Sequence, residues 1–295
     1  MITIDNVTKR YFSLLAVDRV SFTVPRGQVL GILGPNGAGK TTLFKLIAGF
    51  LNPDSGEIRP TQSLWPVIGY KPERLLFPNQ MRVSEYLAVI ARLGGVSRKV
   101  VDETVRAALA QVKLLESSEK RIGQCSKGMR QRLALAQALI GAPSIILLDE
   151  PSNGLDPEGQ ADIQRLIRHI GAGGQTVIMS SHQLAEVTQT CDYLIILKQG
   201  RVHYMGTMAD ALALRPLVTI EVDRDLQPIA GMLASLHQDI KMEGRQILLA
   251  NEAIRLRRHV LSLLVGMGFD ITGVAQKRTT LEEIYAEAVQ WHNAS

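Results

Sequence analysis

The chain is organised around nine residues, Gly34-Pro35-Asn36-Gly37-Ala38-Gly39-Lys40-Thr41-Thr42. It matches the phosphate-binding template G-x-x-x-x-G-K-[ST] at every fixed position. The apolar run before it, Val29–Leu33, is typical of a buried strand, and the apolar residues after Lys40 fall at helical spacing. Glycines allow the backbone to turn its N–H groups toward phosphates, and the helix N-terminus adds positive potential. We therefore expect a nucleotide site between a strand and a helix.

Each part of this loop has an expected contact. Lys40 is placed to reach the β- and γ-phosphates, and the Thr41 hydroxyl is placed to ligate Mg²⁺. The loop residues expected to bind the nucleotide are Gly34, Asn36, Gly37, Ala38, Gly39, Lys40, Thr41 and Thr42.

A second apolar run, residues 144–148, ends in two carboxylates, Asp149 and Glu150. Asp149 is placed to hold Mg²⁺ through water, because it follows a buried strand directly. An adjacent carboxylate at a strand end suits the polarisation of an attacking water, so Glu150 is the expected catalytic base. The sequence thus predicts a bound nucleotide with Mg²⁺, and these motifs alone leave kinases, GTPases and motor ATPases open.

The composition restricts the class of protein. With 295 residues, the chain can form one large domain or one domain and an appendage. The net charge of +5 comes from scattered Lys and Arg, which favours a solvated surface, so we expect no nucleic-acid partner. Cys125 and Cys191 form no C-x-x-C pair, so neither a disulfide framework nor a zinc site is indicated. The N-terminus lacks the features of a signal peptide, and no apolar run approaches the ~20 residues that span a bilayer.

The order of the patterns predicts the organisation of the chain. Residues 1–30 alternate as antiparallel strands, and later strands alternate with helices, which indicates a parallel sheet covered by helices. One helical pattern covers Val83 to Ala110 and another covers Met129 to Ile140, so the block at about 74–140 is expected to be an insertion. After residue 215 the pattern predicts a small α+β appendage. Its elements are a strand near Val218–Val222, a helix, a strand at Ile247–Ala250, a helix at Ala253–Met267, a strand near Ile271–Ala275 and a last helix.

The stretch Cys125-Ser126-Lys127-Gly128-Met129-Arg130-Gln131-Arg132 resembles the signature motif of ABC ATPases, in the form found in the type-2 exporter group. The resemblance covers roughly residues 1 to 215 in motif order. It implies a P-loop NTPase core, made of a RecA-like parallel sheet with an antiparallel β subdomain and an inserted helical subdomain. Residues 1–215 would form the ABC ATPase domain and residues 216–295 an accessory α+β domain.

The resemblance also implies a dimer. Ser126, Lys127 and Gly128 begin a helix, which is a ready anion site. In the family this site meets the γ-phosphate that is bound to the loop of the other subunit. One chain carries one loop and one signature, so the implied active unit contains two copies and two nucleotides.

Further motifs resemble the family one residue at a time. Tyr11, which precedes Ala16-Val17, resembles the aromatic that stacks on adenine, and Val17 is also expected to bind the nucleotide. Asp156 resembles the end of the loop that crosses the dimer interface, and His182 resembles the switch histidine that contacts the γ-phosphate. Two positions depart from the common pattern: Glu73 stands where Gln is usual, as an expected ligand of Mg²⁺ or water, and Cys125 replaces the usual Leu.

The function implied by the resemblance is the ATPase subunit of a bacterial ABC exporter, with ATP and Mg²⁺ as cofactors. Such a subunit works with integral membrane subunits as a peripheral protein at the cytoplasmic face of the inner membrane. Two alternatives stay open: a soluble ABC ATPase acting on ribosomes or DNA, and a nucleotide-binding module that regulates a membrane complex.

The apolar segment 74–78 suits either a docking groove for a partner helix or ordinary packing of the inserted block. Residues 280–285 resemble the closing element of exporter ATPase subunits.

Overall fold

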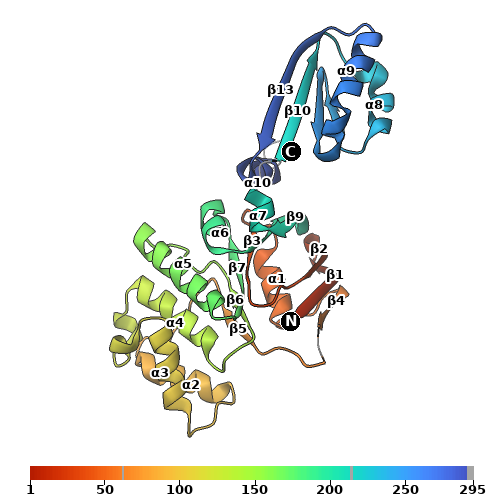
Figure 1. The fold of residues 1–295 in the computed structure, drawn as a ribbon. Coiled ribbons are helices and arrows are strands. Elements are labelled where there is room, and N and C mark those ends of the chain that lie inside the picture. The colour runs from red at the N-terminus through yellow and green to blue at the C-terminus, as the bar shows by residue number, and fades with distance from the viewer. Residues whose placement is uncertain (62, 213–214, 291–295) are drawn as a thin grey trace. The chain divides into compact units, whose positions relative to one another are not determined.

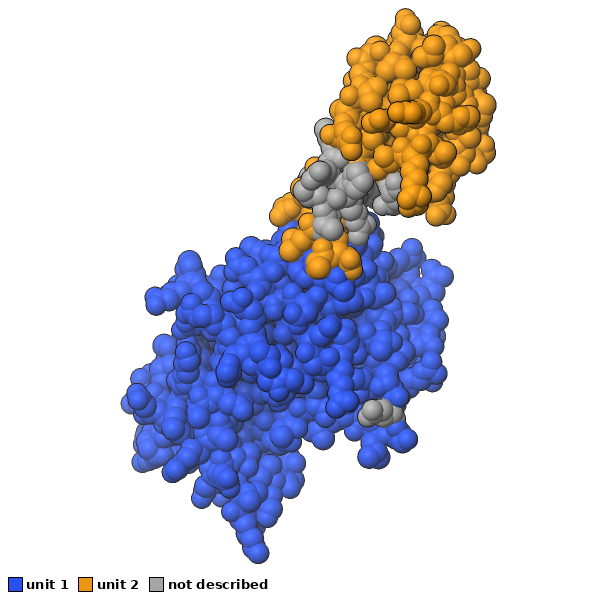
Figure 2. Space-filling model, in the orientation of Figure 1, with its two compact units in different colours: residues 1–208, 288–295 blue, residues 209–287 orange. Residues whose placement is uncertain are grey.

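The computed structural model describes residues 1–61, 63–212 and 215–290 (Figure 1). It contains two compact units, Met1–Met208 together with Ala288–Ser295, and Ala209–Glu287 (Figure 2). The nucleotide loop and the other predicted site residues all belong to the first unit.

The first unit is built on a sheet whose strand order is β5-β6-β7-β3-β8-β9. Strands β5, β6, β7, β3 and β8 run parallel, and β9 pairs antiparallel with β8. The bounds are β3 Val29–Leu33, β5 Ile68–Lys71, β6 Ile145–Leu148, β7 Thr176–Ser181, β8 Tyr193–Lys198 and β9 Arg201–Thr207. Every residue of β3, β6 and β7 is buried, which explains the continuous apolar runs of β3 and β6, whereas β7 is apolar only at residues 177–179. The predicted parallel core is confirmed.

Different elements cover the two faces of this sheet. Leu30 and Ile32 of β3 belong to a core cluster with Leu43 and Phe44 of α1 (Lys40–Ile47). The residue between them, Gly31, faces the other way, because a Cβ there would meet Cys191 Sγ at 2.8 Å. Helices α5 (Pro157–Ala172) and α6 (Leu184–Thr190) lie against β3 and β7.

The predicted antiparallel strands at the N-terminus are also present. They form a sheet of order β2-β1-β4, with bounds β1 Ile2–Tyr11, β2 Leu14–Thr23 and β4 Ser55–Pro60. Their buried residues join the same core cluster as α1.

The inserted block consists of α2 (Val83–Leu93), α3 (Val101–Gln111), short 3₁₀ turns at Leu115–Ser117 and Ile122–Gln124, and α4 (Lys127–Leu139). The single helical pattern expected from Val83 to Ala110 was wrong, because the structure has two helices there. Gly94 follows α2, and Gly95 takes a left-handed φ of 81°, which ends the helix. Apolar periodicity continues across this break because both helices bury one face.

The second unit has a sheet of order β11-β12-β10-β13, in which every pair is antiparallel. With α8 after β10 and α9 before β13, the chain follows the β-α-β-β-α-β order of a split βαβ fold. The bounds are α7 Met208–Leu212, β10 Arg215–Val222, a 3₁₀ turn Gln227–Ile229, α8 Ala230–Leu236, β11 Ile240–Glu243, β12 Gln246–Ala250, a 3₁₀ turn Asn251–Leu256, α9 Arg257–Gly266, β13 Ile271–Thr279 and α10 Leu281–Gln290. Sequence patterns missed β11, and the helix expected at Ala253–Met267 begins as the 3₁₀ turn.

Within the described residues, no helix has the length and apolar character required to cross a membrane.

Candidate active site

The nucleotide loop connects the end of β3 to the start of α1, and close backbone contacts fix its shape. Gly39 has a φ of 100°, and a Cβ at this position would lie 2.1 Å from the carbonyl oxygen of Ala16. A Cβ at Gly34 would lie 2.4 Å from the carbonyl oxygen of Leu197. Only glycine fits at these two positions, because the neighbouring atoms are backbone and cannot move aside. The loop is therefore held between β2 and the end of β8.

The side chain of Lys40 is buried beside the loop. Its Nζ donates to the carbonyl oxygen of Gly34 at 2.7 Å and lies 3.4 Å from Glu150 Oε1. Both side chains are less than a tenth exposed, so the ammonium and the carboxylate form a buried ion pair. The two residues that the sequence assigned to phosphate binding and to catalysis thus meet directly.

Asp149 and Glu150 follow β6 and are tied together by Ser180 at the end of β7. Ser180 Oγ donates to Asp149 Oδ1 at 2.6 Å and accepts the N–H of Glu150 at 2.9 Å. Glu150 takes a left-handed φ of 47°, which turns its side chain out of the strand direction. His182 Nδ1 lies 2.9 Å from Glu150 Oε2, so the histidine and Lys40 hold the two oxygens of this carboxylate.

Two charged residues that sequence reasoning did not select lie buried behind these groups. Lys71 is 1% exposed, and its Nζ donates to the carbonyl oxygens of Asp149 and Glu150 at 3.0 and 3.3 Å. Burial lowers the pKa of Lys71 to about 8, against the opposing effect of nearby carboxylates such as Asp149. Strand alternation could have indicated that Lys71 is buried, because Gly69 and Lys71 are the two residues on the buried face of β5.

Glu186, on α6, is the second of these residues. Its carboxylate accepts hydrogen bonds from the hydroxyls of Ser152 and Ser181, and burial raises its pKa. Because Ser152 follows Glu150 by two residues and Ser181 precedes His182, this carboxylate connects the two chain segments that carry the predicted catalytic groups.

Most of the predicted residues line one cleft of about 590 Å³. Those lining it are Tyr11, Asn36, Gly37, Ala38, Gly39, Lys40, Thr41, Thr42, Glu73, Glu150 and His182. Leu14, Ala16 and Asn153 also line it, although the sequence did not single out their side chains for a role. Apart from the signature residues and Asp156, three predicted residues do not line the cleft: Val17 and Asp149 are buried, and Gly34 lies against the backbone of Leu197.

The signature residues lie elsewhere, in a separate hollow of about 250 Å³ lined by Ser126, Gly128 and Asp156 among others. Ser126 is the N-cap of α4 and accepts the N–H of Met129 at 3.2 Å, whereas Asp156 caps α5 through the N–H of Gly159 at 3.0 Å. The Lys127 side chain passes over Gly154, where a Cβ would lie 1.9 Å from Lys127 Nζ. The cleft and this hollow share no lining residue.

The donor set near the cleft fits Mg²⁺ held together with phosphates. Asp149 is fully buried, and its Oδ2 has no hydrogen-bond partner. Thr41 lines the cleft with its hydroxyl-bearing side chain. Within the described ranges, no three His, Cys, Asp or Glu residues cluster as a metal cage. This pattern suits Mg²⁺, which typically uses one or two carboxylates plus substrate phosphates rather than an all-protein site.

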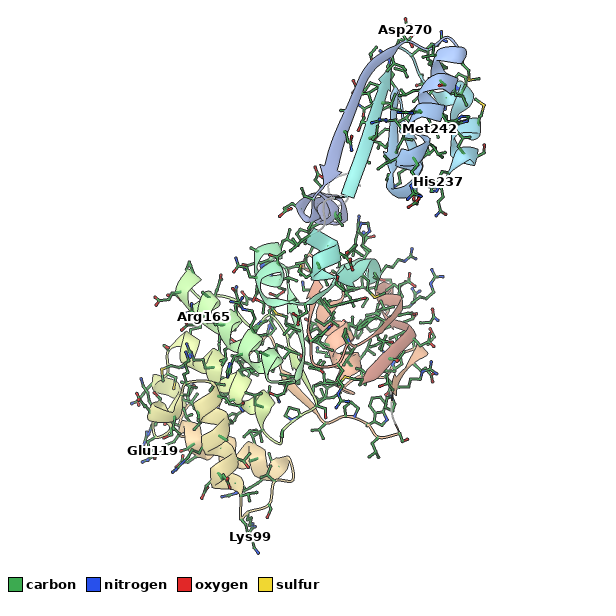
Figure 3. The ribbon with its side chains drawn as sticks, viewed as in Figure 1. Lys99, Glu119, Arg165, His237, Met242 and Asp270 are labelled. Atoms are coloured by element: carbon green, nitrogen blue, oxygen red, sulfur yellow. The ribbon has the colours of Figure 1, made fainter. Side chains whose placement is uncertain are left out.

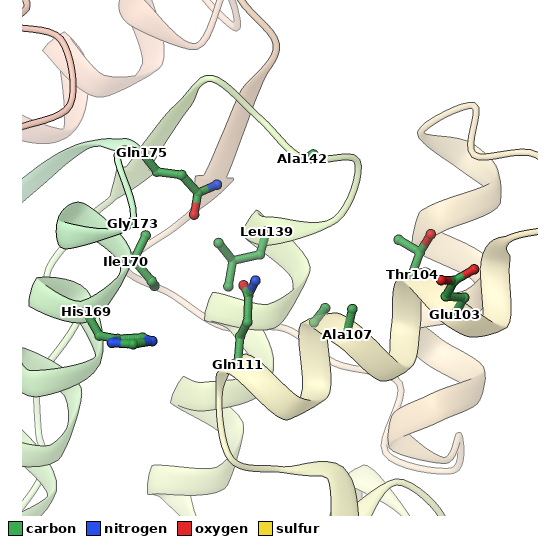
Figure 4. A pocket seen from close by; sticks show the side chains of 11 residues that line it. Glu103, Thr104, Ala107, Gln111, Leu139, Ala142, His169, Ile170, Gly173 and Gln175 are labelled. Carbon is green, nitrogen blue, oxygen red and sulfur yellow. The ribbon is translucent and has the colours of Figure 1, made fainter.

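Another hollow, of about 510 Å³, lies between α3, α4 and α5 (Figure 4). Glu103, Gln111, His169 and Gln175 surround it, with Leu139 and Ile170 on its walls. None of the predicted site residues line it, so it is distinct from the nucleotide cleft.

Known proteins resemble this chain over both units. A family model described as "ABC transporter" matches residues 17–153, which include the loop, Asp149 and Glu150. The chain is 33% identical over 294 residues to the uncharacterized ABC transporter ATP-binding protein YxlF of Bacillus subtilis (strain 168), with 98% of this chain and 99% of YxlF covered. It is 35% identical over 204 residues to Nod factor export ATP-binding protein I of Burkholderia lata, covering 66% and 67% of the two chains. A solved dimeric bacterial ABC transporter cassette, MJ0796, matches with 25% identity and a TM-score of 0.63 over 70% of this chain and 99% of that one.

Proposed function

The chain belongs to the ABC transporter family as an ATP-binding subunit with ATPase activity, and from this premise we propose that two copies enclose two ATP molecules and drive the membrane subunits of an exporter. The observation that carries the proposal is the separation of the loop cleft from the signature hollow within one chain. A second copy would bring its Ser126 and Gly128 to the cleft of the first.

The residues of the cleft then have distinct roles in hydrolysis. Lys40 and the N–H groups of the loop bind the β- and γ-phosphates, and Tyr11 stacks on adenine. Glu150 accepts the proton of the water that attacks the γ-phosphate. His182 holds that carboxylate through Nδ1 and contacts the γ-phosphate from the end of β7.

Mg²⁺ would be held by the Thr41 hydroxyl and, through water, by Asp149, with Glu73 as a further oxygen ligand at the rim of the cleft. When bound, it would neutralise charge on the phosphates. The buried Oδ2 of Asp149, which lacks a protein partner, supports this assignment.

Transport is driven by the coupling between ATP binding and closure of the dimer. ATP that contacts both copies binds the closed pair more tightly than the open pair, so it shifts the population toward closure. Hydrolysis removes the γ-phosphate contact with the second copy and releases the pair. The similarity to a Nod factor export protein supports export as the direction of transport.

An exposed apolar side chain in the segment after Glu73 supports contact with a membrane subunit. Leu76 is 91% exposed. Phe77 of the same segment instead packs against Tyr86, with ring centroids 5.3 Å apart. The segment thus combines a packed anchor with an exposed apolar side chain, which suits docking of a partner helix and supports a location at the membrane surface.

Complementation between two inactive variants tests the two-copy site. Lys40→Ala removes the phosphate contact, and Gly128→Leu fills the signature with a side chain for which the single chain has space, since the nearest atom to a Cβ there lies 4.0 Å away. In a homodimer of either variant, both sites are defective. In a mixed dimer, one site combines an intact loop with an intact signature, so mixing should restore ATPase activity. No recovery on mixing the two folded variants would contradict the proposal.

Affinity purification from gently solubilised membranes of the native host tests the partner. A multi-span membrane protein should accompany the tagged parent chain and be lost with Leu76→Asp, while the ATPase activity of the isolated variant stays unchanged. Recovery of ribosomal or DNA-repair proteins without a membrane partner would contradict the proposal.

A further inference from the structure

We propose that Lys71 is a positioning residue for ATP hydrolysis: its ammonium group fixes the backbone of Asp149 and Glu150 and connects it to the chain that leaves β5 at Pro72. The inference deepens the proposed function, because it rests on Glu150 as the catalytic base.

Lys71 is placed by the parallel pairing of β5 and β6, in which it lies opposite Leu148. Its Nζ donates to three carbonyl oxygens: that of Asp149 at 3.0 Å, that of Glu150 at 3.3 Å and that of Pro72 at 3.3 Å. The side chain is 1% exposed. A buried ammonium is costly unless its hydrogens are bonded, and here each of the three N–H bonds has an acceptor.

The peptide units around Glu150 need such support. Glu150 has a φ of 47°, which is an uncommon conformation for a residue with a side chain. The N–H of Glu150 donates to Ser180 Oγ. The carbonyl oxygen of Glu150 accepts from Lys71 Nζ and, at 3.3 Å, from the N–H of Asn153. The backbone of Glu150 is thus held on both sides, and its direction sets where the carboxylate lies in the cleft.

Lys71 also connects this backbone to the segment that begins at Pro72. That segment carries Glu73 at the rim of the cleft and the exposed Leu76. The same ammonium donates to the carbonyl oxygen of Pro72 and to those of Asp149 and Glu150. A displacement of the segment would therefore shift the Lys71 ammonium, and with it the hydrogen bond to the backbone of Glu150. Contact with a partner at Leu76 would therefore reach Glu150 through this side chain.

A purely structural lysine would give a different outcome on substitution. Lys71→Met keeps a long unbranched side chain in the buried position but removes all three donors. Removing the ammonium abolishes the cost of burying a charge but leaves three carbonyl oxygens without this donor. The thermal midpoint measures the net effect on the fold, and kcat of the folded variant measures positioning.

The test measures steady-state ATPase activity of the full chain, with kcat expressed per nucleotide-binding site and the thermal midpoint measured in parallel. For Lys71→Met we expect kcat to fall about tenfold or more, as for other small displacements of a catalytic group, with KM for ATP within about twofold of the parent. Lys99→Met, at an exposed position (Figure 3), is the matched control and should behave as the parent. Lys71→Leu provides a second apolar variant with the same expectation.

Each result has a defined meaning. A kcat of Lys71→Met within twofold of the parent would overturn the inference. A tenfold rise in KM for ATP with kcat preserved would overturn it too, because the lysine would then serve ATP binding. Failure of both Lys71 variants to fold would also overturn it, because the side chain would then serve the fold. If Glu150→Gln hydrolyses ATP at the parental rate, the proposed base is wrong; if Glu150→Gln is inactive while Lys71→Met is fully active, only the role of Lys71 is refuted.

Discussion

Replacing Glu150 by Gln removes the expected catalytic base while preserving the size of the side chain. The carboxylate is almost fully buried, 3.4 Å from Lys40 Nζ and 2.9 Å from His182 Nδ1. A positioned base typically contributes about 10²- to 10⁴-fold to the rate. We therefore expect kcat to fall by about this factor, which corresponds to about 3–5 kcal/mol of transition-state stabilisation.

The same substitution should not weaken ATP binding. A unit charge pair at 3.4 Å is worth about 5 kcal/mol of gross Coulomb energy at an effective dielectric constant of about 20, before the cost of desolvation. This attraction holds Lys40 toward Glu150 and away from phosphates. The neutral amide releases the ammonium and removes a negative charge near the γ-phosphate, so ATP affinity should stay equal or increase.

Two assays check this prediction. Phosphate release measures turnover, and light scattering with and without ATP and Mg²⁺ measures whether the variant accumulates as a dimer. Glu116→Gln, on an exposed 3₁₀ turn, is the control for loss of a carboxylate. A Glu150→Gln rate within tenfold of the parent, or an ATP affinity reduced by tenfold, would refute the reasoning.

Two further substitutions test the site, and a pair of glycine substitutions tests the packing of the fold. Lys40→Ala removes a charged hydrogen-bond donor, so the Kd for ATP should rise about 10- to 100-fold, as measured by fluorescence titration; an unchanged Kd would exclude Lys40 from the phosphate site. Asp149→Asn should raise the Mg²⁺ concentration for half-maximal ATPase activity about tenfold or more, and an unchanged Mg²⁺ titration would contradict that ligand assignment. Gly69→Ala places a Cβ 1.8 Å from the carbonyl oxygen of Ala138 and should cost about 1–3 kcal/mol in chemical denaturation. Gly231→Ala, with open space and a helical position, should be neutral or stabilising, and equal losses for the two glycines would contradict the packing argument.

The sequence predicted the elements whose signal is local. The loop of residues 34–42, the strand before it and the helix after it are contiguous, because a phosphate site is made from consecutive backbone N–H groups at a helix start. Asp149 and Glu150 were recognisable for the same reason, as carboxylates directly after a buried run. The family resemblance of the signature motif added the expected dimer.

Local sequence patterns failed to predict two elements, each of which depends on a single backbone conformation or on pairing with another strand. The break between α2 and α3 depends on the left-handed Gly95 and leaves the apolar periodicity unchanged. Strand β11 alternates over only four residues, Ile240–Glu243, and is defined by its pairing with β12.

Only the tertiary structure decided how the catalytic carboxylate is held. Lys71 and Asp149 are 78 residues apart, and Ser180 follows Glu150 by 30, yet parallel pairing of β5, β6 and β7 places all of these at one edge of the sheet. The residue types alone give no indication of these bonds, since a lysine in a sequence is usually solvated. Burial between paired strands leaves this lysine only backbone carbonyls to bond, and this is why the fold, rather than the motif, determines its role.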